Sequence, residues 1–202
     1  MNKNSKIQKG FTLIELIVVL SILAILVVLA IPSFESIFNN NRLTANANEM
    51  LSTVQFSRME AVRRNERIVI CRSDNPDVAP VCNAAAGDWP GWLSFADDGA
   101  GGGTARDGVL NGGETVLNVG TFNAPLQLQA SPAISAGSQR IIFRPDGLAY
   151  SNAGILLNAQ ISFCIPVALP PENVRDISIA SGARIVVVRR NGAGACVAPA
   201  DS

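Results

Sequence analysis

Hydrophobic side chains form one uninterrupted stretch near the start of the chain. Residues 11–31 read FTLIELIVVLSILAILVVLAI and contain a single charged residue, Glu15. A helix of about 20 predominantly apolar residues is long enough to cross the hydrocarbon core of a bilayer. The pattern therefore predicts a transmembrane helix over residues 11–31.

Beyond this stretch the apolar positions become periodic. They recur mostly at steps of three and four residues, at Phe34, Ile37, Phe38, Leu43, Ala47, Met50, Leu51, Val54, Ala61 and Val62. This spacing places them on one face of a helix, so we expect residues 32–66 to continue the first helix in amphipathic form, to about Asn65. A helix from residue 11 to 65 would be roughly 80 Å long at 1.5 Å per residue. Its first half should therefore project from the rest of the protein.

Pro32 lies at the junction of these two segments. A proline inside a helix removes one backbone donor and tends to kink or loosen the helix there. Such a point would let the helix bend. A proline simply tolerated where the chain leaves the membrane explains the residue equally well.

Residues 67–202 have the pattern of a β-rich head. Short runs of β-forming residues alternate there with clusters of Gly, Pro, Asn and Asp. The predicted strands cover residues 68–72, 92–95, 114–119, 139–143, 160–165, 176–180 and 184–188. We interpret Trp89, Trp92, Phe143 and Phe163 as core or turn anchors in preference to a binding face.

The charges are distributed unevenly along the chain. All lysines lie in the first ten residues, at Lys3, Lys6 and Lys9, and no acid accompanies them. The positive-inside rule then places the N-terminus in the cytoplasm and the head outside, which in a Gram-negative cell is the periplasm. Without these lysines, 13 of the 16 basic residues remain against 16 acidic ones, a balance that argues against a general polyanion binder.

Composition also weakens most enzyme classes. The chain has no histidine, the commonest general base and nitrogen ligand for metals, and no nucleophile–base pair stands out. We therefore expect neither catalysis nor a cofactor. The four cysteines lack CxxC spacing, and in an exported domain an even number favours two disulfides. We prefer the sequential pairs Cys71–Cys82 and Cys164–Cys196, although four cysteines permit three pairings.

The order of segments at the N-terminus differs from that of a secretory signal, whose cleavage site follows a shorter apolar core. Here the plausible processing point, between Gly10 and Phe11, precedes the apolar run. The sequence KGFTLIEL over residues 9–16 resembles the prepilin peptidase site of type IV pilins and type II secretion pseudopilins. The resemblance implies cleavage after Gly10, N-methylation of Phe11 and a structural role for Glu15.

An acid in the middle of an apolar helix needs a physical reason, since insertion scales assign it a cost of roughly 2.5–3.5 kcal/mol. For Glu15 that reason could be the amine of a neighbouring subunit's first residue, paired away from water in a filament. The alternative is an acid tolerated one turn from the membrane surface, within reach of water.

Four further segments resemble the minor pilin and pseudopilin group called the GspH/FimT family. They are QFSRMEAVRRN at 55–65, IVIC at 68–71, WPGWLSFADD at 89–98 and IIFRPDGLAY at 141–150. The resemblance implies an α+β pilin-like fold, with a long N-terminal helix packed on an antiparallel sheet assembly. It implies a minor pilin that helps type IV pilus assembly or initiation, or alternatively a type II secretion pseudopilin. Expected partners are other pilins, the prepilin peptidase and methylase, and the inner membrane before assembly.

The glycine-rich loop at residues 96–113 carries several oxygen ligands. Asp97, Asp98, Asp107, Asn111 and Glu114 are of the type that calcium uses, but their spacing does not match an EF-hand. We favour a solvated acidic hairpin tip and expect no metal. The loop also lacks the GxxxxGK[ST] pattern of a phosphate-binding loop.

A third functional hypothesis is DNA binding, because some family members bind DNA through a C-terminal GRxR motif. The corresponding segment here is SGARIVVVRR at 181–190, which keeps Gly182 but has Ala183 and Ile185 at the two arginine positions. A basic patch could still form from Arg175, Arg184, Arg189 and Arg190 and contact phosphates. We favour a solvated strand edge, whose charges keep it from pairing.

Overall fold

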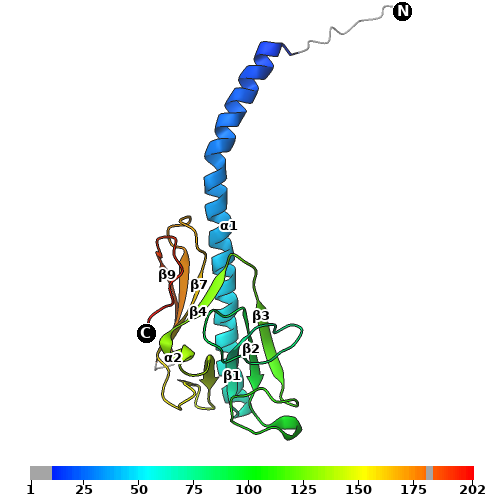
Figure 1. The fold of residues 1–202 in the computed structure, drawn as a ribbon, viewed down its shortest axis with the longest axis vertical. Helices are drawn as coiled ribbons and strands as arrows, with labels where there is room; N and C mark the ends of the chain where they lie inside the picture. Colours follow the sequence, from blue (N-terminus) through cyan, green and yellow to red (C-terminus); the bar gives the residue numbers. More distant parts are fainter. Residues whose placement is uncertain (1–10, 181–183) are drawn as a thin grey trace, which may run out of the picture.

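The computed structural model describes residues 11–180 and 184–202, apart from the side chains of Leu29, Ala30 and Pro32. One long helix, α1 (Leu13–Arg64), leads into a head that contains the strands (Figure 1). The N-terminal half of α1 stands clear of the head, and its C-terminal half packs against both sheets of the head. The predicted α+β fold class, with a projecting first half of the helix, is confirmed.

Both ends of α1 are capped by residues that the local sequence provides. Thr12 is the N-cap, with extended backbone, and Asn65 ends the helix in the left-handed region at φ 56° and ψ 38°, a conformation that asparagine tolerates well. The helix thus ends where its periodicity predicts. α1 runs through Pro32 as one helix and curves gently in Figure 1, so local loosening at Pro32 stays a prediction.

The strands form two antiparallel sheets. The five-stranded sheet has the order β3-β2-β1-β5-β6, and the four-stranded sheet has the order β4-β7-β8-β9. The first contains β1 (Ile68–Ser73), β2 (Gly91–Ala96), β3 (Val116–Thr121), β5 (Arg140–Phe143) and β6 (Ala149–Tyr150). The second contains β4 (Gln127–Ala130), β7 (Ala159–Cys164), β8 (Val174–Ile179) and β9 (Ile185–Arg190).

The main core lies between α1 and the two sheets. On the helix side it contains Leu43, Ala47, Met50, Val54 and Ala61, all essentially inaccessible to solvent. Their three- and four-residue spacing makes one helical face, as the sequence predicts. The sheets meet this face with apolar residues from every second strand position, such as Ile68 and Ile70 of β1.

A smaller cluster covers the opposite face of the first sheet. Because side chains alternate along a strand, Val69 and Cys71 of β1 point away from α1. They pack with residues of β2 and β5, namely Leu93, Phe95 and Ile142, under a partial cover of Cys82, Leu110 and Tyr150. β1 is therefore buried on both faces and forms the centre of the head.

The four aromatic residues singled out in the sequence are buried, so their interpretation as core anchors is confirmed. The Trp92 ring stacks on Phe122 and meets Phe163 edge-on, with ring centroids 6.2 and 5.9 Å away. The Trp89 indole N–H donates to Gln139 Oε1 at 2.7 Å. Each indole nitrogen thus finds a partner inside the core, that of Trp92 being Thr53 Oγ1.

Candidate functional site

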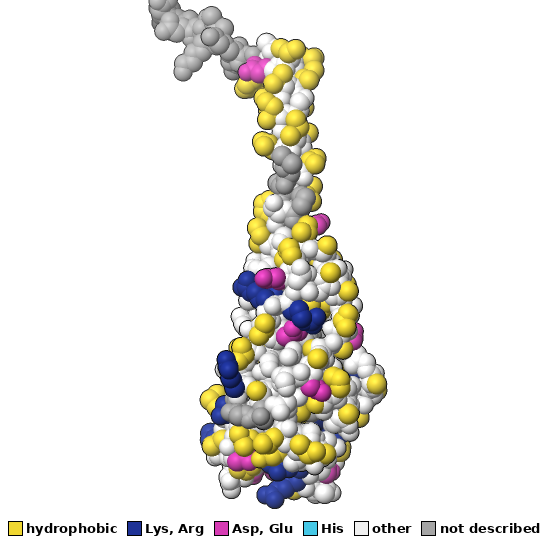
Figure 2. Space-filling view, turned by 90° about the vertical axis from the view of Figure 1, so that its left-hand side faces the viewer, with side chains coloured by type: hydrophobic (Ala, Val, Ile, Leu, Met, Phe, Trp, Pro, Cys, Tyr) yellow, Lys and Arg dark blue, Asp and Glu magenta, His cyan; other side chains and the backbone are white. Residues whose placement is uncertain are grey.

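The stalk, which we define as residues 11–31, is the most unusual surface of the molecule. Every large apolar side chain described there is 48–86% exposed. Figure 2 shows hydrophobic side chains over the stalk and an acidic one near its N-terminal end. A helix that is apolar all round belongs in a membrane or inside a larger assembly. Within the described chain, α1 is the only helix long and apolar enough to span a membrane.

Glu15 sits in the first turn of this helix. Its backbone N–H donates to Thr12 Oγ1 at 3.3 Å, which is half of the capping box that the sequence T-x-x-E signals. This capping signal is present in the sequence but is not among the predictions made from it. A carboxylate at this position also interacts favourably with the positive end of the helix dipole, so Glu15 helps to define where the helix begins.

Phe11 precedes the helix and is 86% exposed. Three residues lie between it and Glu15, of which Thr12 is the extended N-cap of α1. Gly10, the residue before the expected cleavage point, lies outside the described residues. Pro32 belongs to α1, at the point where the stalk ends.

A polar collar, consisting of Asn39, Asn40 and Arg42, joins the helix to loops of the head. Arg42 donates to the carbonyls of Asn123 and Ala124 at 3.0 and 2.9 Å, and Asn39 donates to the carbonyl of Leu169 at 3.1 Å. Asn40 accepts a hydrogen bond from Arg175. These contacts fix the direction in which the stalk leaves the head.

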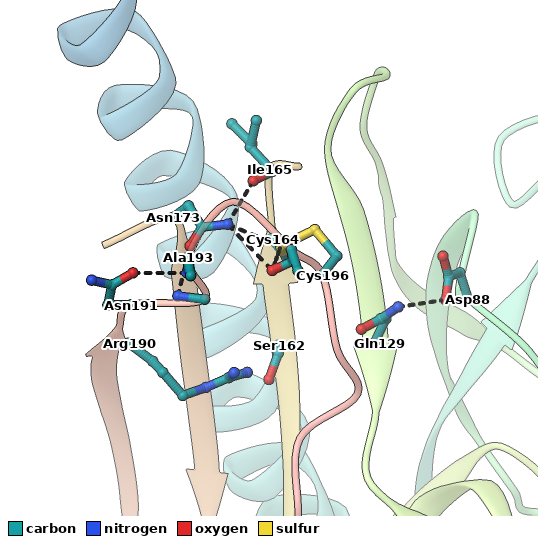
Figure 3. The surroundings of a disulfide bond; sticks show 12 residues. Asp88, Gln129, Ser162, Cys164, Ile165, Asn173, Arg190, Asn191, Ala193 and Cys196 are labelled. Atoms are coloured by element: carbon teal, nitrogen blue, oxygen red, sulfur yellow. Dashed lines mark hydrogen bonds between the residues drawn. A yellow bond between two sulfur atoms is a disulfide. The ribbon is translucent and has the colours of Figure 1, made fainter. Parts of the chain in front are cut away.

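The structure pairs Cys71 with Cys82 and Cys164 with Cys196, which are the pairs that the sequence analysis preferred. Figure 3 shows the second disulfide beside the buried Asn173. The amide of Asn173 donates to the carbonyl of Ile165 at 2.9 Å, and its oxygen accepts from Gly192 N–H at 2.8 Å. Disulfide and amide together hold the C-terminal tail against β7 and β8.

The arginines of the DNA-binding hypothesis have other partners. Arg190 forms an ion pair with Asp176 at 2.6 Å, a contact that raises the pKa of Arg190, and Arg189 lies 3.7 Å from Glu172. Arg175 is buried under the collar, and burial, followed by repulsion from Arg189, lowers its pKa. Arg184 is exposed at the other end of β9. Gly182 and Ala183 lie outside the described residues. These described arginines thus form no open basic patch around β9, and DNA contact stays a prediction.

The acidic loop binds its own backbone. Asp97 accepts from Gly108 N–H at 3.0 Å, Asp107 accepts from Val109 N–H at 2.7 Å, and Glu114 accepts from Gly99 and Asn111 N–H at 3.0 and 2.8 Å. No group of three or more His, Cys, Asp or Glu side chains placed to hold a metal occurs in the described part of the chain. Asp98 likewise accepts a hydrogen bond from Ala100 N–H. The carboxylates thus shape the loop.

A long helix with a bare apolar first half, and with its second half packed in an antiparallel β head, defines the class of pilin-type proteins. The prokaryotic N-terminal methylation motif matches residues 5–31. The family described as type II transport protein GspH matches residues 46–194, and the chain belongs to this family. It is a family of structural pilin-type subunits, consistent with the GspH/FimT resemblance.

Solved structures similar to this chain include two crystal forms of the type IV minor pilin FimU of Pseudomonas aeruginosa. They show 18% and 19% identity, cover 75% and 76% of this chain and 99% and 96% of theirs, and have TM-scores of 0.48 and 0.49. The minor pseudopilin EpsH of the Vibrio cholerae type 2 secretion system shows 11% identity and has a TM-score of 0.47. The match covers 73% of this chain and 97% of that structure. No curated protein sequence matches the chain. The family assignment rests on the two sequence matches.

Proposed function

We propose that this protein is a minor pilin, a structural subunit that helps to initiate or assemble a type IV pilus. The observation that carries the proposal is the stalk, whose apolar surface is exposed on all sides and which lies within the residues that the methylation motif matches. Burying apolar surface yields roughly 25 cal/mol per Å², so the stalk gains stability in a bilayer or among other stalks. Pilin-type proteins assemble with other pilins, and we propose that the stalk is the part of this chain that does so.

The N-terminal processing belongs to the same proposal. The methylation motif implies a prepilin peptidase, and cleavage after Gly10 would remove the three lysines and leave Phe11 as a methylated amine. Glu15 is the one acid of the stalk. Away from water, its carboxylate would pair with the Phe11 amine of a neighbouring subunit, because an unpaired charge there is expensive.

The topology follows from charge and from the cysteines. Lysines ahead of the stalk keep the N-terminus in the cytoplasm, so the head would lie in the periplasm while the protein waits in the inner membrane. Two disulfides in the head suit that compartment, since disulfides persist in the oxidising bacterial periplasm. Assembly would then move the stalk from lipid into a filament.

The second candidate is a pseudopilin of a type II secretion system, and the description of the matched family favours it. Both kinds of filament would use the stalk in the same way. They differ in where the assembled subunit is found, on the cell surface or only in the envelope.

The test compares sheared surface filaments with washed envelopes from the native host. We expect the wild-type protein in both fractions and Glu15→Ala only in the envelope. Glu35→Ala is the matched control, because Glu35 is an exposed acid of α1 just beyond the stalk. Wild-type protein confined to the envelope would favour the secretion pseudopilin. Glu15→Ala in filaments at the wild-type level would contradict the role of Glu15.

A further inference from the structure

Three arginines from distant parts of the sequence line one pocket in the head. Arg67, Arg106 and Arg144, together with Pro145, surround a hollow of about 350 Å³. That size falls within the range of small-molecule sites, roughly 300–1,000 Å³. Arg67 follows closely on the C-terminal end of α1, so the pocket lies at the end of the head opposite the stalk. Figure 2 shows basic side chains gathered at this end.

Strand register explains why two of the arginines meet. β1 lies between β2 and β5, with Ile68 opposite both Ala96 and Phe143. Arg67 immediately precedes Ile68. It therefore has Asp97, which follows β2, on one side and Arg144, which follows β5, on the other. Arg67 and Arg144 lie one residue beyond the paired ends of β1 and β5, and like charges placed opposite each other across neighbouring strands are destabilising.

The third arginine is brought in by the loop between β2 and β3. Arg106 has a positive φ of 66°, which is uncommon for a residue other than glycine. Its carbonyl accepts from Arg67 Nη1 at 2.6 Å, and its N–H donates to the carbonyl of Asp97 at 3.3 Å. The loop is thereby fastened over the end of β1, with the Arg106 side chain exposed at the rim.

Acidic side chains lie near the three guanidinium groups, but none of them lines the pocket. Asp97 is buried at 3.4 Å from Arg67 Nε and makes the one ion pair that the described residues provide to this trio. Asp107 binds within its own loop, and Asp146 accepts from Leu148 N–H at 2.9 Å and from the Tyr150 hydroxyl at 2.6 Å. Asp107 and Asp146 stay charged and attract Arg67 and Arg144, respectively, from outside the pocket. The charged groups of the pocket wall itself are all positive.

Two further observations indicate that the guanidinium groups are positioned for a ligand. The Arg144 guanidinium lies 3.9 Å from the centroid of the Tyr150 ring, an arrangement that supports the cation on one face and leaves its N–H edge for hydrogen bonding. Burial lowers the pKa of Arg67; Asp97 opposes this shift, and repulsion from Arg144 and Arg106 adds to it. An anion in the pocket would relieve that repulsion.

We propose that Arg67, Arg106 and Arg144 form a binding site for a phosphate-type oxyanion at the end of the head opposite the stalk. Arginine forks donate pairs of hydrogen bonds to phosphate oxygens, and three guanidinium groups around one hollow suit a tetrahedral anion with several acceptor oxygens better than a single carboxylate. The site is separate from the stalk. It could therefore bind an anion both before and after the stalk is assembled into a filament.

Tyr150, the only tyrosine of the chain, gives a specific test. The full-length protein, purified in detergent with ring-labelled [13C]tyrosine, is titrated with inorganic phosphate at constant ionic strength. We expect a saturable shift of the single tyrosine signal. Arg106→Gln should weaken binding at least about tenfold, which corresponds to about 1.4 kcal/mol. Acetate should require at least about tenfold higher concentration than phosphate.

The matched control is Arg63→Gln, which removes the same charge from the last turn of α1, outside the pocket, and should keep wild-type binding. Calorimetric titration of Arg144→Gln provides a second variant, because that change alters the tyrosine signal itself; it too should lose binding. Absence of a saturable shift, equal binding by Arg106→Gln and wild type, or acetate binding as tightly as phosphate would each overturn the proposal.

Discussion

At the scale of single residues, Gly120 shows how closely the core is fitted. It faces Trp92 across the β2–β3 pair, and a Cβ atom at this position would lie 2.0 Å from Trp92 Cζ2. An aromatic ring laid over a cross-strand glycine is a known way to pack a sheet. Because Trp92 is buried and locked between Phe122 and Phe163, it cannot move aside without disturbing the core.

We therefore predict that Gly120→Ala lowers the free energy of unfolding by about 2 kcal/mol, within the usual cost of overpacking. In a protein of this size that is a fall of roughly 4–8 °C in melting temperature, measured by circular dichroism. Gly112→Ala is the control, because nothing lies within 4 Å of its added Cβ. Equal melting temperatures for the two variants would show that Trp92 has room to shift.

Some site residues are predictable from the sequence and others are not, for physical reasons. Phe11 and Glu15 stand out locally, because any charge in an apolar run is conspicuous. The three pocket arginines do not, since Arg67, Arg106 and Arg144 come together through strand register and loop closure. Conversely, the arginines near residue 190 look like a patch in the sequence, but the acids that pair with them lie on or beside the neighbouring strand β8.

At the scale of elements, the C-terminal turn of α1 is held by a compact charge cluster. Glu60 accepts from Arg63 at 2.9 and 2.7 Å and from Arg64 at 2.7 Å. These hydrogen bonds lower the pKa of Glu60 from 4.5 to about 2. Basic residues in the last turn also suit the negative end of the helix dipole, so the cluster stabilises the C-terminal end of α1 within the head.

The lowered pKa of Glu60 predicts how the stability of the fold changes with pH. A carboxyl with a depressed folded-state pKa stabilises the fold above its unfolded-state pKa, and this contribution fades as the pH falls from about 4.5 to about 2. Because Arg63 is 65% exposed, solvent screening reduces the effect to about 1–2 kcal/mol. Glu60→Gln should melt below wild type at pH 6, and the difference should vanish near pH 2. A difference independent of pH would contradict this account.

The seven strands predicted from the sequence are all present, each end within two residues of its expected place. Four short elements were not predicted from the sequence: β4, β6, the short helix α2 (Pro132–Ser135) and the 3-10 turn η1 (Ala100–Gly102). β4 alternates glutamine with apolar residues over only four positions, and β6 has two residues. Elements this short owe their form to pairing with β7 and β5, which local patterns do not record.

At the scale of the whole molecule, the two ends of α1 serve different environments. The stalk is apolar on every side, whereas the same helix beyond the polar collar exposes charges and buries one face against two sheets. The sequence shows this division because it follows from the change between a continuous and a periodic apolar pattern. The two disulfides then stabilise the head, by about 3 and 4 kcal/mol for sequence separations of 11 and 32 residues.

The most direct test of the central claim is intact-mass spectrometry of the protein isolated from its native host. A filament subunit of this class should lack residues 1–10 and begin at Phe11 carrying one methyl group, with the stalk retained. A homogeneous product that still begins at Met1, or one cut after the stalk as a secretory signal would be, would contradict the account.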